Sequence, residues 1–195
     1  MVREFRLNSN KEATRKSAAT PTLFQEIRQP QGEYIIVPRH SSENRKYIPF
    51  GFVKPDIIVN DAVQIIPDAN IYHFGILTSN IHMAWTRAVC GRIKSDYRYS
   101  KDIVYNNFPW PTPTEEQKAK IEQTAQEILD ARALYPDSSL ADLYDELAMP
   151  VELRRAHQHN DKAVMQAYGF DYRTMTESEC VAELMKMYQE LTEEI

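Results

Sequence analysis

The sequence predicts an α+β protein in which a mixed or antiparallel sheet packs on one core helix and a small all-α helical bundle follows. Three observations support this fold class. Short β-branched and aromatic runs, bounded by Pro and Gly, fill much of residues 33–66. Apolar residues recur at helical spacing over residues 71–88. Beyond residue 113 the apolar pattern is helical throughout.

Five short runs are the candidate strands. They are Glu33–Val37, Lys46–Val53, Asp56–Val59, Ala62–Ile66 and, after the helical stretch, Ile103–Tyr105. Their side chains are of the kinds that fit a pleated, half-buried surface.

The core helix is expected from one apolar face, made by Ile71, Phe74, Leu77, Ile81, Trp85 and Ala88. Asp68 or Asn70 is a suitable N-cap, and Gly91 suits the left-handed position beyond the C-terminus. We therefore expect one helix packed on the sheet.

A proline-rich segment, residues 108–113, divides the chain. Three prolines cannot continue a helix or pair in a central strand, so a stiff extended linker is predicted. We therefore expect residues 1–112 to belong to one domain and residues 113–195 to a helical domain.

The helical domain is predicted from its start signals. Capping boxes are expected at Thr114/Gln117, Ser139/Asp142 and Thr176/Glu179. Pro150 suits the first turn of a further helix, and Asn160 is expected to cap another that ends at Gly169. The helix that begins at Ser139 is expected to carry Leu147 on its apolar face.

The net charge of −5 is an average over two unlike parts. Residues 1–112 contain 15 Lys and Arg against 10 Asp and Glu, a net of +5, whereas residues 113–195 contain 8 against 18, a net of −10. This asymmetry favours a polyanion partner for the first part only.

Other classes of protein are disfavoured. No apolar run approaches the length of a membrane span, and the N-terminus has no apolar leader segment. Two cysteines, Cys90 and Cys180, cannot form a disulfide framework or a zinc quartet. We expect a cytoplasmic protein that does not contact a membrane.

The residues that carry catalysis are also missing from the sequence. No Gly-rich loop follows a strand, so a phosphate or dinucleotide site is not expected. His157 and His159 point to different faces of a helix and are expected to be solvated, whereas His82 is expected in the core. Cys90 is expected to pack inertly. We predict no catalytic, metal or cofactor-binding residue.

One polar loop between two apolar runs offers several side chains that read DNA. Arg and Lys suit guanine edges or phosphates, Asn suits adenine, and Glu accepts from a cytosine amine. The candidate DNA-binding residues here are Arg39, Ser41, Ser42, Glu43, Asn44, Arg45 and Lys46. The alternative is an ordinary charged hairpin tip.

A second candidate segment spans residues 92–101. If it is extended, Lys94, Asp96, Arg98 and Ser100 share one face, and Ile93, Ser95, Tyr97 and Tyr99 share the other. A cationic face backed by aromatic rings suits a phosphate backbone. The candidates are Arg92, Lys94, Tyr97, Arg98, Tyr99 and Lys101; the alternative is a strand whose cations pair with Asp96.

These segments resemble a known family. Four blocks, Ser41–Phe52, Phe74–Trp85, Gly91–Ser100 and Val104–Pro111, resemble the target recognition domain of MmeI-like adenine-specific DNA methyltransferases from bacterial restriction–modification systems. The helical part resembles the C-terminal domain of that family through Ile128–Arg132, Ser139–Tyr144, Leu153–His157 and Ala167–Phe170.

The resemblance implies a parent enzyme that recognises double-stranded DNA and methylates adenine with S-adenosylmethionine. It also implies that Glu43, Asn44, Arg45 and Lys46 reach base edges. The sequence lacks the cofactor motif and the Asn/Asp-Pro-Pro-Tyr/Phe motif that holds a flipped adenine.

We therefore expect a C-terminal fragment that is not catalytic alone and whose partners are DNA and the missing methyltransferase domain. Residues Arg3–Leu7 would then be a strand from the middle of the recognition domain. The alternative function is a protein-interaction module that docks onto a methyltransferase or restriction complex.

Overall fold

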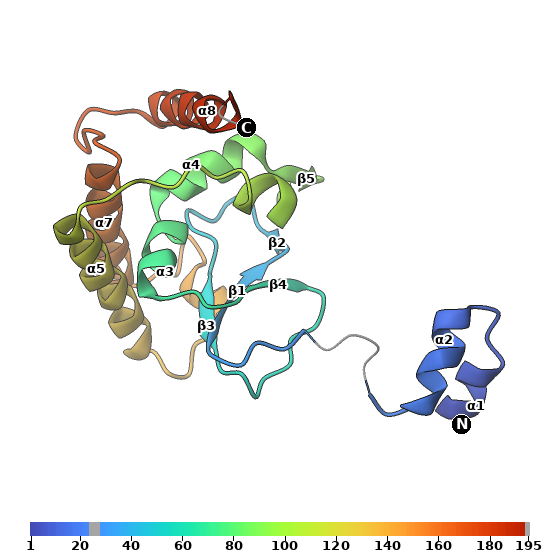
Figure 1. Cartoon of the computed structure of the whole chain (residues 1–195). Helices are drawn as coiled ribbons and strands as arrows, with labels where there is room; N and C mark the ends of the chain where they lie inside the picture. Colours follow the sequence, from blue (N-terminus) through green and yellow to red (C-terminus); the bar gives the residue numbers. More distant parts are fainter. Residues whose placement is uncertain (24–27, 194–195) are drawn as a thin grey trace. The chain divides into compact units, whose positions relative to one another are not determined.

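The computed structural model describes residues 1–23 and 28–193, which form two compact units, Met1–Pro30 and Gln31–Ile195 (Figure 1). Within the described residues, no helix is both long and apolar enough to cross a membrane.

The first unit is helical. It contains α1 (Val2–Leu7), α2 (Glu12–Lys16) and a short 3-10 helix, η1 (Ser17–Ala19). The guanidinium of Arg6 donates to the carbonyl oxygens of Ser17 and Thr20, both at 2.9 Å, and so ties the end of α1 to η1. The predicted strand at Arg3–Leu7 is therefore wrong: these residues lie in a helix whose last turn makes those side-chain bonds.

The second unit contains two small antiparallel sheets. The first has the order β3-β1-β4, formed by β1 (Tyr34–Pro38), β3 (Gly51–Val53) and β4 (Val63–Ile66). In it, Ile35 lies opposite Phe52 on one side and Ile66 on the other.

This sheet confirms the predicted strands at residues 33–37 and 62–66, and it shortens the one at 46–53 to its last three residues. Residues 47–50 are buried but irregular. The predicted strand Asp56–Val59 is wrong, since this segment is a turn followed by irregular backbone and exposes Ile57 and Ile58.

The second sheet has the order β2-β6-β5, formed by β2 (His40–Ser41), β5 (Gly91–Ile93) and β6 (Asp96–Arg98). Residues 92–101 are therefore not one extended strand. Lys94, with a φ of 55°, makes the turn of a hairpin.

The predicted core helix is two helices, α3 (Ile71–Leu77) and α4 (Asn80–Val89). Asn70 caps α3 as predicted, but Ser79 starts a new helix by accepting from the backbone N–H of His82 at 3.4 Å. The hydroxyl of a serine can accept a backbone hydrogen bond and so begin a new helix inside an apolar repeat. The spacing of the apolar residues does not reveal such a break. Gly91 begins β5 and is not left-handed.

Residues 103–105, predicted as a strand, lie in a π-helix, η2 (Lys101–Tyr105). Its position is fixed by the buried indole of Trp85, whose Nε1 donates to the carbonyl oxygen of Val104 at 2.9 Å. A tertiary contact therefore overrides the local β preference.

Four helices complete the chain: α5 (Glu115–Ala133), α6 (Leu140–Leu143), α7 (Val151–Ala167) and α8 (Glu177–Glu193). The capping boxes at Thr114/Gln117 and Ser139/Asp142 are confirmed, and Thr176 and Glu179 bond reciprocally before α8. Leu147, expected in the core, is 99% exposed because α6 ends before it.

One uninterrupted α7 replaces the two shorter helices predicted there. Asn160 does not cap a helix; it is buried, and its Nδ2 donates to the carbonyl oxygen of Gly75 in α3 at 2.7 Å. Gly169, with a φ of 74°, follows the end of α7 as predicted.

A single hydrophobic core joins the parts before and after the proline segment. Figure 1 shows α5 and α7 side by side with α3 against them, and α8 lies against α4. Phe108, Pro109 and Pro111 are buried, and the Tyr168 hydroxyl donates to the carbonyl oxygen of Pro109 at 2.7 Å. The α+β fold class is confirmed, with α3 and α4 completing the helical bundle.

Candidate nucleic-acid interface

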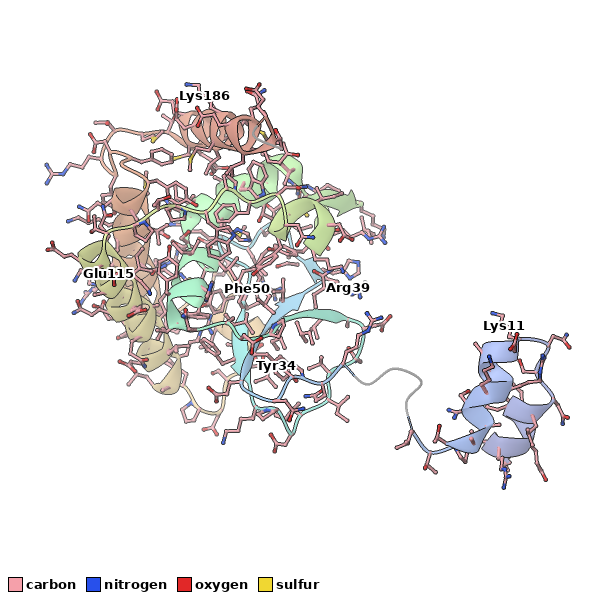
Figure 2. The ribbon with its side chains drawn as sticks, in the orientation of Figure 1. Lys11, Tyr34, Arg39, Phe50, Glu115 and Lys186 are labelled. Carbon is pink, nitrogen blue, oxygen red and sulfur yellow. The ribbon has the colours of Figure 1, made fainter. Side chains whose placement is uncertain are left out.

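The two predicted DNA-binding segments meet in the second sheet. His40 in β2 lies directly opposite Arg98 in β6. Arg39 is fixed between the two sheets, because its backbone N–H donates to Ala62 at 3.0 Å and its carbonyl accepts from the N–H of Tyr99 at 2.8 Å. Its side chain is exposed, whereas Phe50 lies in the interior (Figure 2).

A hollow of about 760 Å³ opens where these strands meet η2. Its lining includes three predicted cations, Arg39, Arg98 and Lys101, together with His40, Gln64 and the two carboxylates of Asp61 and Asp102. The hollow therefore brings together cations from both candidate segments.

Most of the cations in this region are available to a ligand. In the part of the chain that the structure describes, Arg39, Lys94 and Arg98 are exposed and take part in no salt bridge. Lys101 makes only a long, exposed pair with Asp102, at 3.9 Å. Exposed pairs of this kind contribute little, so phosphate oxygens can replace such a partner.

One cation of the β5–β6 hairpin, Arg92, lies over an aromatic ring. The guanidinium of Arg92 lies 4.2 Å from the ring centroid of Tyr97 and donates to the carbonyl oxygen of Ser95 at 2.8 Å. Tyr97 and Tyr99 are buried, as the predicted alternation requires, and Asp96 and Arg98 are exposed. Ile93 departs from that pattern and is 45% exposed, since Lys94 and Ser95 form the turn.

Asp96 does not neutralise the hairpin. Its Oδ1 accepts from the backbone N–H of Glu43 at 3.2 Å, and among residues 1–23 and 28–193 it forms no salt bridge. The alternative of a salt-bridged strand is therefore not supported. The hairpin instead holds the neighbouring loop. The Tyr97 hydroxyl also donates to this loop, at the carbonyl oxygen of Glu43, 3.5 Å away.

Residues 42–50 form that loop, which we name the reading loop after the base contacts that the sequence leads us to expect. Glu43, Asn44 and Lys46 are exposed and Ser42 is half-buried, whereas the predicted Ser41 just before the loop is buried. Arg45 is half-buried, and its Nη2 donates to the carbonyl oxygen of Ala141 at 3.4 Å. Three of the four residues expected at base edges thus project from the surface, and the fourth contacts α6.

Two residues that line the hollow, His40 and Gln64, were not predicted from the sequence. His40 lies between the predicted Arg39 and Ser41, so its position in the same run was an available signal. Gln64, on β4, reaches the hollow only because β4 pairs with β1, and no local feature of the sequence indicates this.

Burial favours the neutral forms of His82, His157 and Cys90. Burial lowers the pKa of His82 to about 3, and its Nε2 bonds to the Tyr99 hydroxyl at 2.9 Å. His157 was expected in solvent and this is wrong, because it is enclosed between Tyr47 and Tyr144. Burial raises the pKa of the Cys90 thiol. The described residues contain no group of three or more potential metal ligands.

The chain is similar to known proteins. The family described as "MmeI, target recognition domain" matches residues 1–112, and "MmeI, C-terminal domain" matches residues 113–195. DNA methyltransferase A of Bacillus subtilis (strain 168) is 42% identical over 188 residues, which are 96% of this chain and 21% of that protein.

A solved structure is also similar. The Type IIL restriction-modification enzyme MmeI, in complex with DNA, matches with a TM-score of 0.89 and 48% identity over 98% of this chain. The match covers 26% of that enzyme, so this chain spans about a quarter or less of both relatives. The chain belongs to the MmeI family, of which it contains the target recognition and C-terminal domains.

Proposed function

We propose that this chain recognises a specific sequence in double-stranded DNA, as the target recognition and C-terminal helical segment of a restriction–modification adenine-specific DNA methyltransferase. The observation that carries the proposal is the group of exposed cations in and beside the second sheet, Arg39, Lys94 and Arg98, which make no salt bridge with any described residue. They lie in a chain whose fold matches an enzyme solved in complex with DNA.

The surface divides into two parts with different chemistry. Arg39, Lys94, Arg98 and Lys101 suit phosphate oxygens, and Arg92 is held over Tyr97 in the same hairpin. Such contacts fix the position of the protein on the duplex but read no sequence. The amide of Asn44, the carboxylate of Glu43 and the ammonium of Lys46 suit base edges in the major groove.

Residues 113–195 are assigned to bracing this surface, and residues 1–112 to recognition. The methylation chemistry and S-adenosylmethionine are assigned to the remainder of the parent enzyme. The described glycines do not fit that cofactor. Gly75 lies inside α3 against Ile121, Gly51 and Gly91 begin strands, and none forms a strand-to-helix turn that could cradle it. The proposed site of action is the bacterial cytoplasm.

The salt dependence of duplex binding tests the proposal. Each phosphate contact contributes a slope of about −0.9 in a plot of log affinity against log salt concentration. We expect the triple variant Arg39→Gln/Lys94→Gln/Arg98→Gln to lose about 3 units of slope relative to the wild-type chain. Fluorescence anisotropy with a labelled duplex measures it.

The matched control is Lys118→Gln/Lys120→Gln/Lys162→Gln, which removes three cations from α5 and α7. It should retain the wild-type slope. Salt-independent binding, or equal slopes in the two triple variants, would overturn the proposed surface. Absence of duplex binding would favour the protein-interaction module.

A further inference from the structure

The reading loop is held from behind by the C-terminal helices. Besides the Arg45 contact to Ala141, two of its residues are anchored there: Tyr47 on α7 and Phe50 on α5. The segment that offers side chains to DNA on one side is therefore bonded to α5, α6 and α7 on the other.

The Tyr47 anchor is fully buried. Its hydroxyl donates to Asp161 Oδ2 at 2.6 Å, and its ring stacks on His157 with 4.0 Å between centroids and 18° between planes. Asp161 Oδ1 accepts from the backbone N–H of Asn80 at 2.7 Å, so the same carboxylate also holds the start of α4.

The Phe50 anchor is a guanidinium. Arg132 Nη1 donates to the carbonyl oxygen of Phe50 at 2.7 Å, and its Nε donates to the Tyr144 hydroxyl at 3.0 Å. The planar fork thus fixes the end of the loop relative to α5 in direction as well as distance.

The Tyr144 hydroxyl joins the two anchors. It accepts from Arg132, which has only donors, and so its own proton is free to be donated to His157 Nε2, 2.7 Å away. That imidazole is the ring stacked on Tyr47. A continuous path, buried except at the half-buried Arg132, therefore runs from Phe50 through Arg132, Tyr144 and His157 to Tyr47.

We propose that Arg132, Tyr144 and Asp161 are positioning residues that set the conformation of the reading loop. DNA sequence preference then depends on C-terminal residues that are not base-reading residues themselves. The part of this inference that concerns DNA rests on the proposed function, whereas the part that concerns the loop conformation does not.

Tyr144→Phe is the test, because it removes the joining hydroxyl and keeps the ring. The control is Tyr135→Phe, which removes an exposed hydroxyl that donates to Glu152 Oε2 at 2.9 Å on the same helical part. In hydrogen–deuterium exchange of the whole chain, the backbone amides of residues 42–50 should exchange about tenfold faster in Tyr144→Phe than in the wild type. In Tyr135→Phe they should exchange at the wild-type rate. Unchanged loop exchange, or an equal rise in β1 and α4, would overturn the inference.

DNA binding supplies the second measurement. For Tyr144→Phe we expect the affinity ratio between a preferred duplex and a single-base variant to fall about tenfold, while affinity for an unrelated duplex stays within twofold. An equal loss of affinity for all duplexes would overturn the inference. If Tyr144→Phe does not fold, Tyr47→Phe removes only the bond to Asp161 and carries the same expectations.

The two proposals fail differently. A wild-type chain that binds no duplex contradicts the proposed function, and the exchange of the loop amides still decides whether the helices position it. A chain that binds DNA with unchanged preference and unchanged loop exchange in Tyr144→Phe contradicts only the positioning role.

Discussion

Arg39 shows how a single residue acquires a role that its neighbours in the sequence do not reveal. Its backbone bonds both sheets, so its side chain projects from a fixed point beside Arg98 and Lys101. The sequence identifies a cation in a polar run, but only the pairing of β1 with β4 and of β2 with β6 places it in the hollow.

Asn44 is the residue whose exposed amide best suits an adenine edge. We predict that Asn44→Ala weakens preference at one base position by about 1–3 kcal/mol and leaves phosphate contacts intact. Competition between duplexes that differ at single positions measures this. Gln158→Ala, on the exposed side of α7, is the control. An equal loss for every duplex would assign Asn44 to the backbone instead.

Asp161 gives a pH-dependent prediction. Burial raises its pKa from 3.8 to about 6, against the lowering effects of bonds from Tyr47 and Asn80 and of the charges of Lys46 and Arg87. The folded state therefore holds the proton more tightly than the unfolded state, and this stabilisation is present below pH 4 and is lost as the pH rises through about 6.

We expect the free energy of unfolding of the wild-type chain to fall by up to about 3 kcal/mol over that range relative to Asp161→Asn. Urea unfolding at several pH values measures the difference between the two proteins. A difference that does not change between pH 4 and pH 7 would contradict the raised pKa.

At the scale of elements, α3 approaches α5 closely at Gly75. A Cβ at Gly75 would lie 2.7 Å from Ile121 Cγ2 and 3.1 Å from the Ala125 Cβ. We predict that Gly75→Ala destabilises the protein by about 1–3 kcal/mol, in spite of the better helix propensity of alanine.

The control is Gly32→Ala, where a Cβ would meet no atom within 4 Å. Chemical denaturation should show near-wild-type stability for the control. Equal stability of the two variants would show that α3 and α5 can separate without cost.

Elements were predictable from the sequence where a local signal fixes them. The capping boxes of α5 and α6 follow from Thr114 and Ser139, and β1 follows from its apolar run. The break at Ser79, the π-helix at Lys101–Tyr105 and the continuity of α7 through Asn160 depend on tertiary hydrogen bonds instead. The candidate cations were likewise predictable, but their convergence and the anchoring of the reading loop were not.

At the scale of the molecule, the basic and acidic parts share one core within Gln31–Ile195. Trp85 and Trp110 precede α5, so their fluorescence reports on the first part of the chain, whereas far-UV circular dichroism is dominated by the C-terminal helices. We predict that both signals show the same thermal transition. Two separated transitions would contradict a shared core and a bracing role for the helices.

The charge of the whole chain also takes on a structural meaning. The net +5 of residues 1–112 includes the exposed cations near the second sheet, whereas residues 113–195, with a net of −10, include α5, α6 and α7, which bond to the reading loop from behind. A polyanion is therefore expected to approach from the side of β2, β5 and β6.

Selection from a pool of random duplexes is the most direct test of sequence-specific recognition. The chain is incubated with the pool, and the retained duplexes are sequenced over several rounds. The proposed function predicts enrichment of one short sequence, and loss of preference at one of its positions in Asn44→Ala. Retention of all sequences in equal proportion, or of none, would contradict it.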